Sequence, residues 1–366
     1  MAQTSCPDCG EPVRPGDRFC EACGHDLEAP ASAARDRPRN ASLRWLTATE
    51  IAAACPACQG RNFSSDGFCE ECGQRRPTAR NHTELDLGVV AAVTDIGSRH
   101  HRNEDAVAIG VLDGAVAVVV CDGVSSSSRP DTASHAAADA AMAALLDGLA
   151  GGDDRDASII AATRAAQAAA TVVAGSHPGP NPPSCTFVSA VVTADAITVG
   201  WVGDSRAYWL PDGEGEPLLL TVDDSLRNSL AARGVSGKAI DENPHAASLV
   251  RWLGADATDT DPHLRTIAPE APGRVLVCSD GLFRYRPVVT DLAAAVAAAK
   301  GSPLAGAQRL TWLALDEGGQ DNVTVVLAPY PIGPVGSATV TAAAVTAAAI
   351  AAVAAGEEGP SEGSRI

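Results

Sequence analysis

The sequence is poor in aromatic residues, methionine and lysine. Aromatic side chains make up 4% of the 366 residues, there are 2 methionines, and Lys238 and Lys300 are the only lysines. Apolar residues nevertheless make up 46% and charged residues 20%, which is enough for a buried core and excludes disorder over the whole chain. A chain of this length has room for one large domain and a small one, or for two domains of ordinary size.

Positive charge is also scarce. Lys and Arg total 27 against 45 Asp and Glu, a net charge of −18, which argues against a protein whose main function is to bind the nucleic-acid backbone. The excess lies in residues 82–332, which contain 16 basic and 31 acidic residues. Part of this excess is typical of a solvated surface, and the remainder favours a domain that binds cations.

The start of the chain lacks the apolar stretch of a secretory signal, because Met1 to Gly10 is polar and reaches a Cys-x-x-Cys pair at once. Eight of the 11 cysteines precede residue 73, whereas Cys121, Cys185 and Cys278 stand singly in apolar runs. We therefore expect a reducing, cytoplasmic location. The early cysteines are then metal ligands, not disulfides, and the three later ones are core residues.

A set of four cysteines occurs twice near the start of the chain. Both copies have the spacing C-x2-C-x10-C-x2-C, and the second is displaced from the first by 49 positions. A Cys-x-x-Cys turn presents two thiolates to one ion, so each copy predicts a structural Zn²⁺ site with four sulfur ligands. Iron in the same cage and redox-active thiols are the alternatives. The ligands are Cys6, Cys9, Cys20 and Cys23 in one site and Cys55, Cys58, Cys69 and Cys72 in the other.

The two cysteine sets resemble the double zinc ribbon family over residues 6–73. This resemblance implies a module that docks on an unidentified protein partner. Nucleic-acid binding through the arginines between the two sets is a minor alternative, because residues 1–81 carry 10 basic and 11 acidic residues. These arginines are Arg35, Arg37, Arg39 and Arg44.

Shifts in composition divide the chain into four parts. We expect a ribbon module at 1–75 (ribbons at 6–24 and 55–73), a hinge at 76–86, a larger domain at 87–330 and an Ala-rich tail at 331–366. Residues 336–355 carry no charge and are long enough to cross a membrane. Because alanine contributes little to insertion and no Lys or Arg flanks the segment, we expect a disordered or loosely helical tail, with membrane insertion as the alternative.

The larger domain alternates short apolar runs with Gly and Asp, which is typical of buried strands. Two long Ala-rich segments and several shorter ones predict helices. Strands come in groups with paired helices between them, which favours an α+β fold over an alternating doubly wound one. The expected strands are Val89–Val93, Val107–Val111, Ala115–Cys121, Thr186–Val192, Ile197–Val202, Arg206–Leu210, Val275–Cys278 and Val323–Leu327, and the expected helices Thr132–Leu149, Ala157–Ala174, Ser225–Arg233, Pro244–Leu253, Val288–Lys300 and Pro303–Leu315.

Acidic residues recur where these strands end, beside Gly or another small or polar residue. Since strand ends meet at one edge of a sheet, the carboxylates are expected to share one cleft. Several carboxylates so close together repel one another unless divalent cations neutralise them, and such cations prefer oxygen ligands. The motifs are Asn103-Glu104-Asp105, Cys121-Asp122-Gly123, Gly203-Asp204-Ser205-Arg206, Cys278-Ser279-Asp280-Gly281 and Gly318-Gly319-Gln320-Asp321-Asn322.

These motifs, in this order, resemble those of the PPM-type (type 2C) metal-dependent protein serine/threonine phosphatases, over residues 88–328. The resemblance implies a β-sandwich flanked by helical layers, with α-β-β-α architecture. It implies hydrolysis of phosphoserine and phosphothreonine in the substrates of Ser/Thr kinases by a water that two Mn²⁺ or Mg²⁺ ions activate. The acids implied as catalytic are Glu104, Asp105, Asp122, Asp280 and Asp321.

The resemblance also implies a role for each metal ligand. Asp122 bridges the two ions, and Glu104 and the carbonyl of Gly123 bind one of them. Asp280 and Asp321 bind the other ion, and Asp105 holds coordinating waters. Asp204 binds a third, weaker ion together with Asp280.

The sequence departs from the family pattern at several positions outside the metal ligands. His100 stands where the family has a phosphate-binding arginine, so phosphate binding is expected from His100 and its neighbours Arg99 and Arg102. Asp224 stands where a histidine is common, and 124–128 replaces a glycine-containing loop. These departures favour the alternative of a pseudophosphatase scaffold, which binds phosphoproteins with little turnover. The intact acids favour the enzyme. We expect neither nucleic acid nor a membrane as a partner.

Overall fold

The computed structural model describes residues 44–47, 62, 69–72, 81–175, 179–299 and 301–333. The chain divides into two units, Met1–Asn40 and Ala41–Ile366, and every element described below belongs to the second. Of the eight predicted zinc ligands, Cys69 and Cys72 are described, and the other six lie outside the described residues. The uncharged segment 336–355 also lies outside them.

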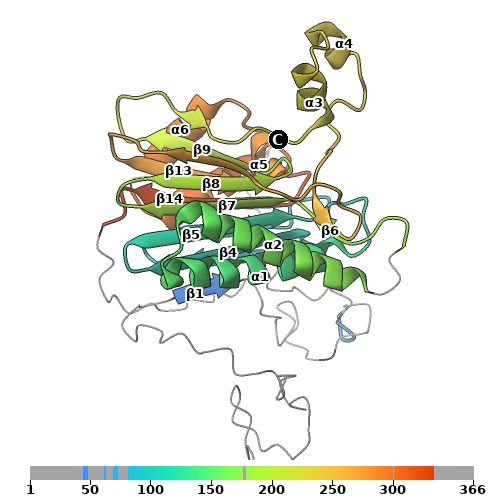
Figure 1. Cartoon of the computed structure of the whole chain (residues 1–366), viewed down its shortest axis with the longest axis horizontal. Helices are drawn as coiled ribbons and strands as arrows, with labels where there is room; N and C mark the ends of the chain where they lie inside the picture. Colours follow the sequence, from blue (N-terminus) through green and yellow to red (C-terminus); the bar gives the residue numbers. More distant parts are fainter. Residues whose placement is uncertain are drawn as a thin grey trace, which may run out of the picture. The chain divides into compact units, whose positions relative to one another are not determined.

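Two six-stranded antiparallel sheets lie against each other in this unit (Figure 1). The strand order is β1-β4-β5-β7-β8-β12 in the first sheet and β10-β9-β13-β14-β3-β2 in the second, and β6 and β11 form a separate pair. The strands are β1 Arg44–Thr47, β2 His82–Asp86, β3 Ala91–Asp95, β4 Asp105–Leu112, β5 Ala115–Asp122, β6 Ser184–Cys185, β7 Phe187–Thr193, β8 Ile197–Val202, β9 Arg206–Pro211, β10 Leu218–Leu219, β11 Leu253–Gly254, β12 His263–Ile267, β13 Gly273–Cys278 and β14 Val323–Tyr330.

Helices cover the outer face of each sheet, which gives the α-β-β-α architecture that the sequence predicts. The long antiparallel pair α1 and α2 lies on the first sheet, and α5, α6 and α7 pack on the second (Figure 1). The short helices α3 and α4 stand away from the sandwich (Figure 1). The helices are α1 Pro130–Gly151, α2 Arg155–Ala174, α3 Leu226–Ala232, α4 Gly237–Asp241, α5 Asp280–Phe283, α6 Val289–Ala298 and α7 Pro303–Asp316.

Alternation along the strands produces three apolar layers. In β4, Val107, Ile109 and Val111 point into the layer between the sheets, while Ala106 and Ala108 face α1. In the same way β14 directs one set of residues between the sheets and the other towards α6 and α7. Because successive strand residues face opposite sides, strands covered on both faces are apolar throughout, which is why their sequences read as continuous apolar runs.

All eight expected strands are present, and so are five of the six expected helices, within a few residues at their ends. The helix predicted at Pro244–Leu253 is wrong. The segment starts as a turn, in which Ser248 donates to the carbonyl of His245, and it then bonds to neighbouring segments: Leu226 donates to the carbonyl of Ser248, and Val250 donates to that of Asp224. The buried residues Cys121, Cys185 and Cys278 confirm the prediction of three core cysteines.

Two strands come from segments that we assigned elsewhere. β2 lies within the predicted hinge at 76–86, yet it pairs with β3 at the edge of the second sheet. β1 lies between the two cysteine sets in sequence, yet it pairs with β4 at the edge of the first sheet, with Leu46 opposite Ile109. The sandwich therefore uses backbone from the chain that precedes residue 87.

One helix in the described ranges, α2, is long and apolar enough to cross a membrane. Its buried residues Ile159, Ala162 and Ala166 pack in the layer between the helices and the first sheet. A core helix satisfies the same criterion, so α2 gives little support for a membrane span.

Candidate active site

The acidic motifs meet at one end of the sandwich. Asp105 begins β4 and Asp122 ends β5, and the two are direct partners across the ladder. Asp280 follows β13 as the first residue of α5, and Asp321 lies two residues before β14 begins. Asp204 occupies the turn between β8 and β9. The expectation that these carboxylates gather at one edge is therefore confirmed.

Two glycines allow the motif backbones to approach closely. A Cβ atom at Gly123 would lie 2.8 Å from the carbonyl oxygen of Glu104, and one at Gly281 would lie 2.0 Å from that of Asn322. Both distances are shorter than a Cβ atom tolerates, so only glycine fits. The Gly123 N–H donates to the Glu104 carbonyl at 3.0 Å, which ties the end of β5 to the start of β4.

Asp105 is the most deeply buried of these acids, with 1% of its surface exposed. Its Oδ2 accepts hydrogen bonds from the hydroxyls of Ser279 and Thr324, each at 2.7 Å. Its Oδ1 is buried and has no hydrogen-bond partner. Burial raises the pKa of Asp105 to about 6, while the two hydroxyl donors oppose the shift. An unpartnered buried carboxylate oxygen requires a ligand, and a cation or its bound water would satisfy it.

Three other acids in the cluster, Asp122, Asp204 and Asp280, also resist ionisation. Burial raises the pKa of Asp122 well above its usual range, and the charges of Asp105, Asp280, Asp204 and Asp321 raise it further. Burial likewise raises the pKa of Asp280 to about 8 and that of Asp204 to about 6. Ionised carboxylates this close repel one another, and bound cations would remove that repulsion. The cluster therefore favours bound cations.

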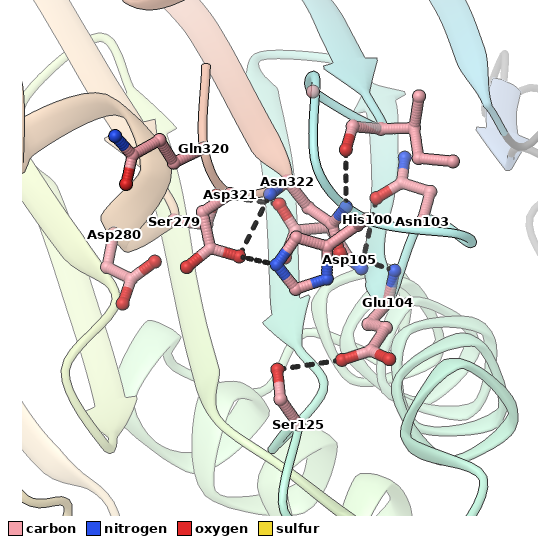
Figure 2. Close-up of polar contacts among 12 residues, drawn as sticks. His100, Asn103, Glu104, Asp105, Ser125, Ser279, Asp280, Gln320, Asp321 and Asn322 are labelled. Carbon is pink, nitrogen blue, oxygen red and sulfur yellow. Dashed lines mark hydrogen bonds and ion pairs between the residues drawn. The ribbon is translucent and has the colours of Figure 1, made fainter. Parts of the chain in front are cut away.

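Glu104 is held on both sides of its peptide and at its side chain. Its N–H donates to Oδ1 of Asn322 at 2.7 Å, and its carbonyl accepts from Ser134 Oγ at 2.5 Å. Its Oε2 accepts a hydrogen bond from Ser125 Oγ at 2.8 Å, as Figure 2 shows. Asn322 also donates to the carbonyl of Ile96, so it fixes the loop that leads into β4.

Asp321 contacts two nitrogen-bearing side chains, His100 and Arg284. Its Oδ1 lies 3.0 Å from Nε2 of His100, and Figure 2 shows Asp321 between His100 and Asp280. Its Oδ2 lies 3.1 Å from Nη1 of Arg284, whose Nη2 lies 2.5 Å from Oδ2 of Asp280. Arg284 thus joins two acids that come from different elements.

The three residues predicted to bind phosphate are placed differently from one another. His100 reaches the carboxylate cluster through Asp321. Arg102 pairs with Asp131 at 3.0 Å and lies 3.9 Å from Glu104, at the edge of the cluster. Arg99 is exposed. Their role in phosphate binding stays a prediction.

The turn that carries Asp204 is anchored by two neighbouring acids. Asp223 accepts two hydrogen bonds from the guanidinium of Arg206, at 2.7 and 2.9 Å. Asp224 accepts from the Gly203 N–H at 2.9 Å and also contacts Arg251 and His263. The departure at position 224 therefore has a structural role here, because the acid fixes the backbone beside Asp204.

The donor set suits a hard divalent cation. The converging groups are carboxylates, and Asp105 Oδ1 is left without a partner, which fits Mn²⁺ or Mg²⁺ and not a soft metal. Within the part of the chain that the structure describes, no three Asp, Glu, His or Cys side chains are gathered closely enough to hold one ion as they stand. Arg284, His100 and Ser125 instead hold Asp280, Asp321 and Glu104.

Sequence reasoning assigned no role to the groups that hold the acids, although Ser279 and Asn322 stand within the acidic motifs. Ser125, Ser279, Thr324 and Asn322 act through hydrogen bonds whose partners are distant in sequence. Arg284 had a local signal, because it follows Asp280 by four positions in a helical segment and such residues are neighbours on a helix.

Known families match both the larger domain and the segment that contains the two cysteine sets. The family model described as Protein phosphatase 2C matches residues 97–313, and the model described as Double zinc ribbon matches residues 6–74. The first match covers more than half of the chain.

Among curated proteins, the chain is similar to the serine/threonine protein phosphatase PstP of two Mycobacterium tuberculosis strains. Each is 31% identical over 239 residues, which is 65% of this chain and 44% of the relative. The chain therefore spans less than half the length of these relatives.

Solved structures share the fold. The serine/threonine phosphatase PstP/Ppp of Mycobacterium tuberculosis is 28% identical with a TM-score of 0.50, over 66% of this chain and 98% of that one. The PPM Ser-Thr phosphatase MsPP of Mycobacterium smegmatis, solved in complex with cacodylate, is 28% identical with a TM-score of 0.52, over 69% of this chain and 100% of that one. A serine/threonine phosphatase of Staphylococcus aureus is 24% identical with a TM-score of 0.56, over 69% of this chain and 98% of that one, and shows the fold alone.

Proposed function

The chain belongs to the protein phosphatase 2C family, and from this premise we propose that it hydrolyses phosphoserine and phosphothreonine in proteins. The observation that carries the proposal is the convergence of five carboxylates from separate elements at one end of the sandwich, four of them with a raised pKa. An acidic cluster of this kind repels a phosphate dianion unless cations are bound, so we propose that Mn²⁺ or Mg²⁺ is the cofactor.

The residues of this chain have separate tasks in the proposed reaction. Asp122 and the Gly123 carbonyl at the end of β5, with Glu104 before β4, would hold one ion, and Asp280 and Asp321 would hold the other. Two bound divalent ions supply a water of lowered pKa, oriented for attack on phosphorus, and neutralise the phosphoryl oxygens. Asp105 would offer its buried, unpartnered Oδ1 to a metal-bound water, because Ser279 and Thr324 hold its other oxygen. Asp204 would hold a third, weaker ion with Asp280.

The test is hydrolysis of p-nitrophenyl phosphate and of a phosphothreonine peptide with and without Mn²⁺. Replacing Asp122 by Asn removes one negative charge from the centre of the cluster with almost no change of volume. We expect Mn²⁺-dependent hydrolysis by the unaltered chain and a loss of at least about 100-fold in the Asp122→Asn variant. Equal and negligible rates for both proteins with metal present would overturn the proposal.

A pseudophosphatase scaffold is the second candidate. It is favoured by one observation, namely that Arg284 and His100 occupy oxygens of Asp280 and Asp321 that a metal ion would use. The scaffold predicts binding of a phosphothreonine peptide without turnover. The same assay, with peptide binding measured in parallel, separates the two candidates.

We further propose that the ribbons hold two structural Zn²⁺ ions and dock the chain on a protein partner. With four thiolates per ion no coordination position is left for a reactant, so the ribbons contribute no chemistry. The proposed substrates are phosphoproteins made by Ser/Thr kinases, and the proposed location is the cytoplasm. Binding assays of the full chain with nucleic acid and with lipid vesicles are expected to show no binding.

A further inference from the structure

Arg284 lies where a cation would be expected among the acids. It follows α5 directly, and its N–H donates to the carbonyl of Asp280 at 3.0 Å. This last turn of helix carries the guanidinium back over the cluster, where one nitrogen contacts Asp280 and another contacts Asp321. The side chain thus spans the two acids assigned to the second ion.

The guanidinium approaches the acids from the solvent side. The side chain of Arg284 is 60% exposed, whereas those of Asp280 and Asp321 are 11% and 25% exposed. A side chain this exposed is not fixed by packing against its neighbours. Arg284 can therefore leave the acids without disturbing the core, provided that another cation takes its place on the two carboxylates.

Two cations compete for the same carboxylate oxygens. The oxygens that Arg284 contacts are Oδ2 of Asp280 and Oδ2 of Asp321. A divalent ion binding both acids offers twice the charge of a guanidinium, so it would displace the arginine. The displaced group stays at the mouth of the site because its backbone is held by α5. Its planar set of N–H donors matches phosphate oxygens in pairs.

We propose that Arg284 is a two-position residue: it neutralises Asp280 and Asp321 when no metal is bound, and it binds the phosphoryl group of the substrate when metal is bound. The first half depends only on the contacts described above. The second half rests on the proposed phosphatase function.

The nearby Arg286 provides a matched control. It is two positions further along the chain, and its guanidinium pairs with Glu317, not with the cluster. Both variants lose an arginine from the same segment, but only Arg284→Ala removes a cation from Asp280 and Asp321.

The experiment is calorimetric titration of the metal-free full chain with Mn²⁺, followed by steady-state kinetics. We expect Arg284→Ala to bind Mn²⁺ about tenfold more tightly than the unaltered chain, because its competitor is gone. We expect its KM for p-nitrophenyl phosphate to rise about tenfold, because the phosphate loses its paired donors. Arg286→Ala is expected to change neither value. Arg284→Lys keeps the charge without the paired donors. Its Mn²⁺ affinity should therefore return to that of the unaltered chain, while its KM should stay as high as that of Arg284→Ala.

The outcomes separate the inference from the proposed function. An unaltered chain that binds no Mn²⁺ would contradict the proposed function. Mn²⁺ binding that is unchanged or weaker in a folded Arg284→Ala variant would overturn the first half of the inference. Tighter binding with an unchanged KM would overturn the second half. Circular dichroism checks that each variant is folded.

Discussion

At the scale of single residues, the site depends on neutral groups that orient the acids. Ser125 is an exposed serine, and its hydroxyl donates to Oε2 of Glu104 at 2.8 Å. Figure 2 shows this contact at the edge of the cluster, away from Asp280. Hydrogen bonds of this kind fix the direction in which a metal-ligating carboxylate points.

The Ser125→Ala variant is therefore expected to bind Mn²⁺ about tenfold more weakly, since Glu104 loses the donor that orients it. Calorimetric titration of the full chain measures this affinity directly, whatever the catalytic rate. Ser126→Ala serves as the control, because Ser126 is an exposed neighbour in the same loop. Ser125→Thr retains the hydroxyl and should restore the affinity. Equal affinities for all of these proteins would show that Ser125 does not position Glu104.

The acids of the site could be predicted from sequence, whereas their supporting groups could not. Each acid stands beside Gly or a small polar residue at the end of an apolar run, which is a local signal. Ser279 and Thr324 reach Asp105 from positions 174 and 219 residues away, so no local pattern reveals them. The role of Ser125 depends on a loop conformation that its serine-rich sequence does not specify.

At the scale of elements, β2 pairs with β3 at the edge of the second sheet, and a His82–Asp95 contact links the two strands. Nδ1 of His82 lies 2.7 Å from Asp95 Oδ2 in the next strand, and its ring lies 6.5 Å from that of Trp312 on α7. The hydrogen bond to Asp95 raises the pKa of His82, although burial opposes it. Protonated His82 is therefore favoured in the folded state.

The stability of this edge should depend on pH. Because the folded pKa of His82 is raised above the unfolded value of 6.5, its contribution is complete below about pH 6.5 and is lost as the pH rises through the folded pKa. We expect His82→Gln to lower Tm more at pH 6 than at pH 8.5. The control is His245→Gln, an exposed histidine in a turn. The same Tm difference at both pH values would refute the role of this pair.

Strands buried on both faces were predictable from their sequences, whereas the exposed strand β12 was not. β4 and β5 are apolar along nearly their whole length, so their sequences identify them. β12 is exposed along most of its length and lacks that signal. The segment 244–253 was expected to be a helix, but its backbone is bonded to the start of α3. Such pairing with a neighbour is not visible in composition.

At the scale of the whole molecule, the sequence assigns cysteines to two different uses. Eight are spaced as metal ligands, while Cys121, Cys185 and Cys278 are buried in the sandwich. Burial raises the pKa of Cys121 and of Cys278, which keeps these thiols protonated and unsuited to metal. Among the cysteines, those of the two repeated sets are therefore the expected zinc ligands.

We expect about two zinc ions per chain after purification without chelator, as measured by elemental analysis. Cys6→Ser should lower the content to about one, because its site loses a ligand. Cys185→Ala removes a buried cysteine outside the ribbons and should leave the content unchanged. Iron in place of zinc, or no metal at all, would contradict the assignment.

The position of β1 has a practical consequence for anyone who wishes to work with the sandwich alone. Residues 44–47 pair with 108–111 of β4, at the margin of the first sheet. A shortened chain that starts at β2 would leave the N–H and C=O groups of that margin unpaired and open to solvent. Unprotected margins of this kind recruit strands from other molecules, so such a fragment invites aggregation. A fragment that retains residues 44–47 keeps the backbone groups of β4 paired.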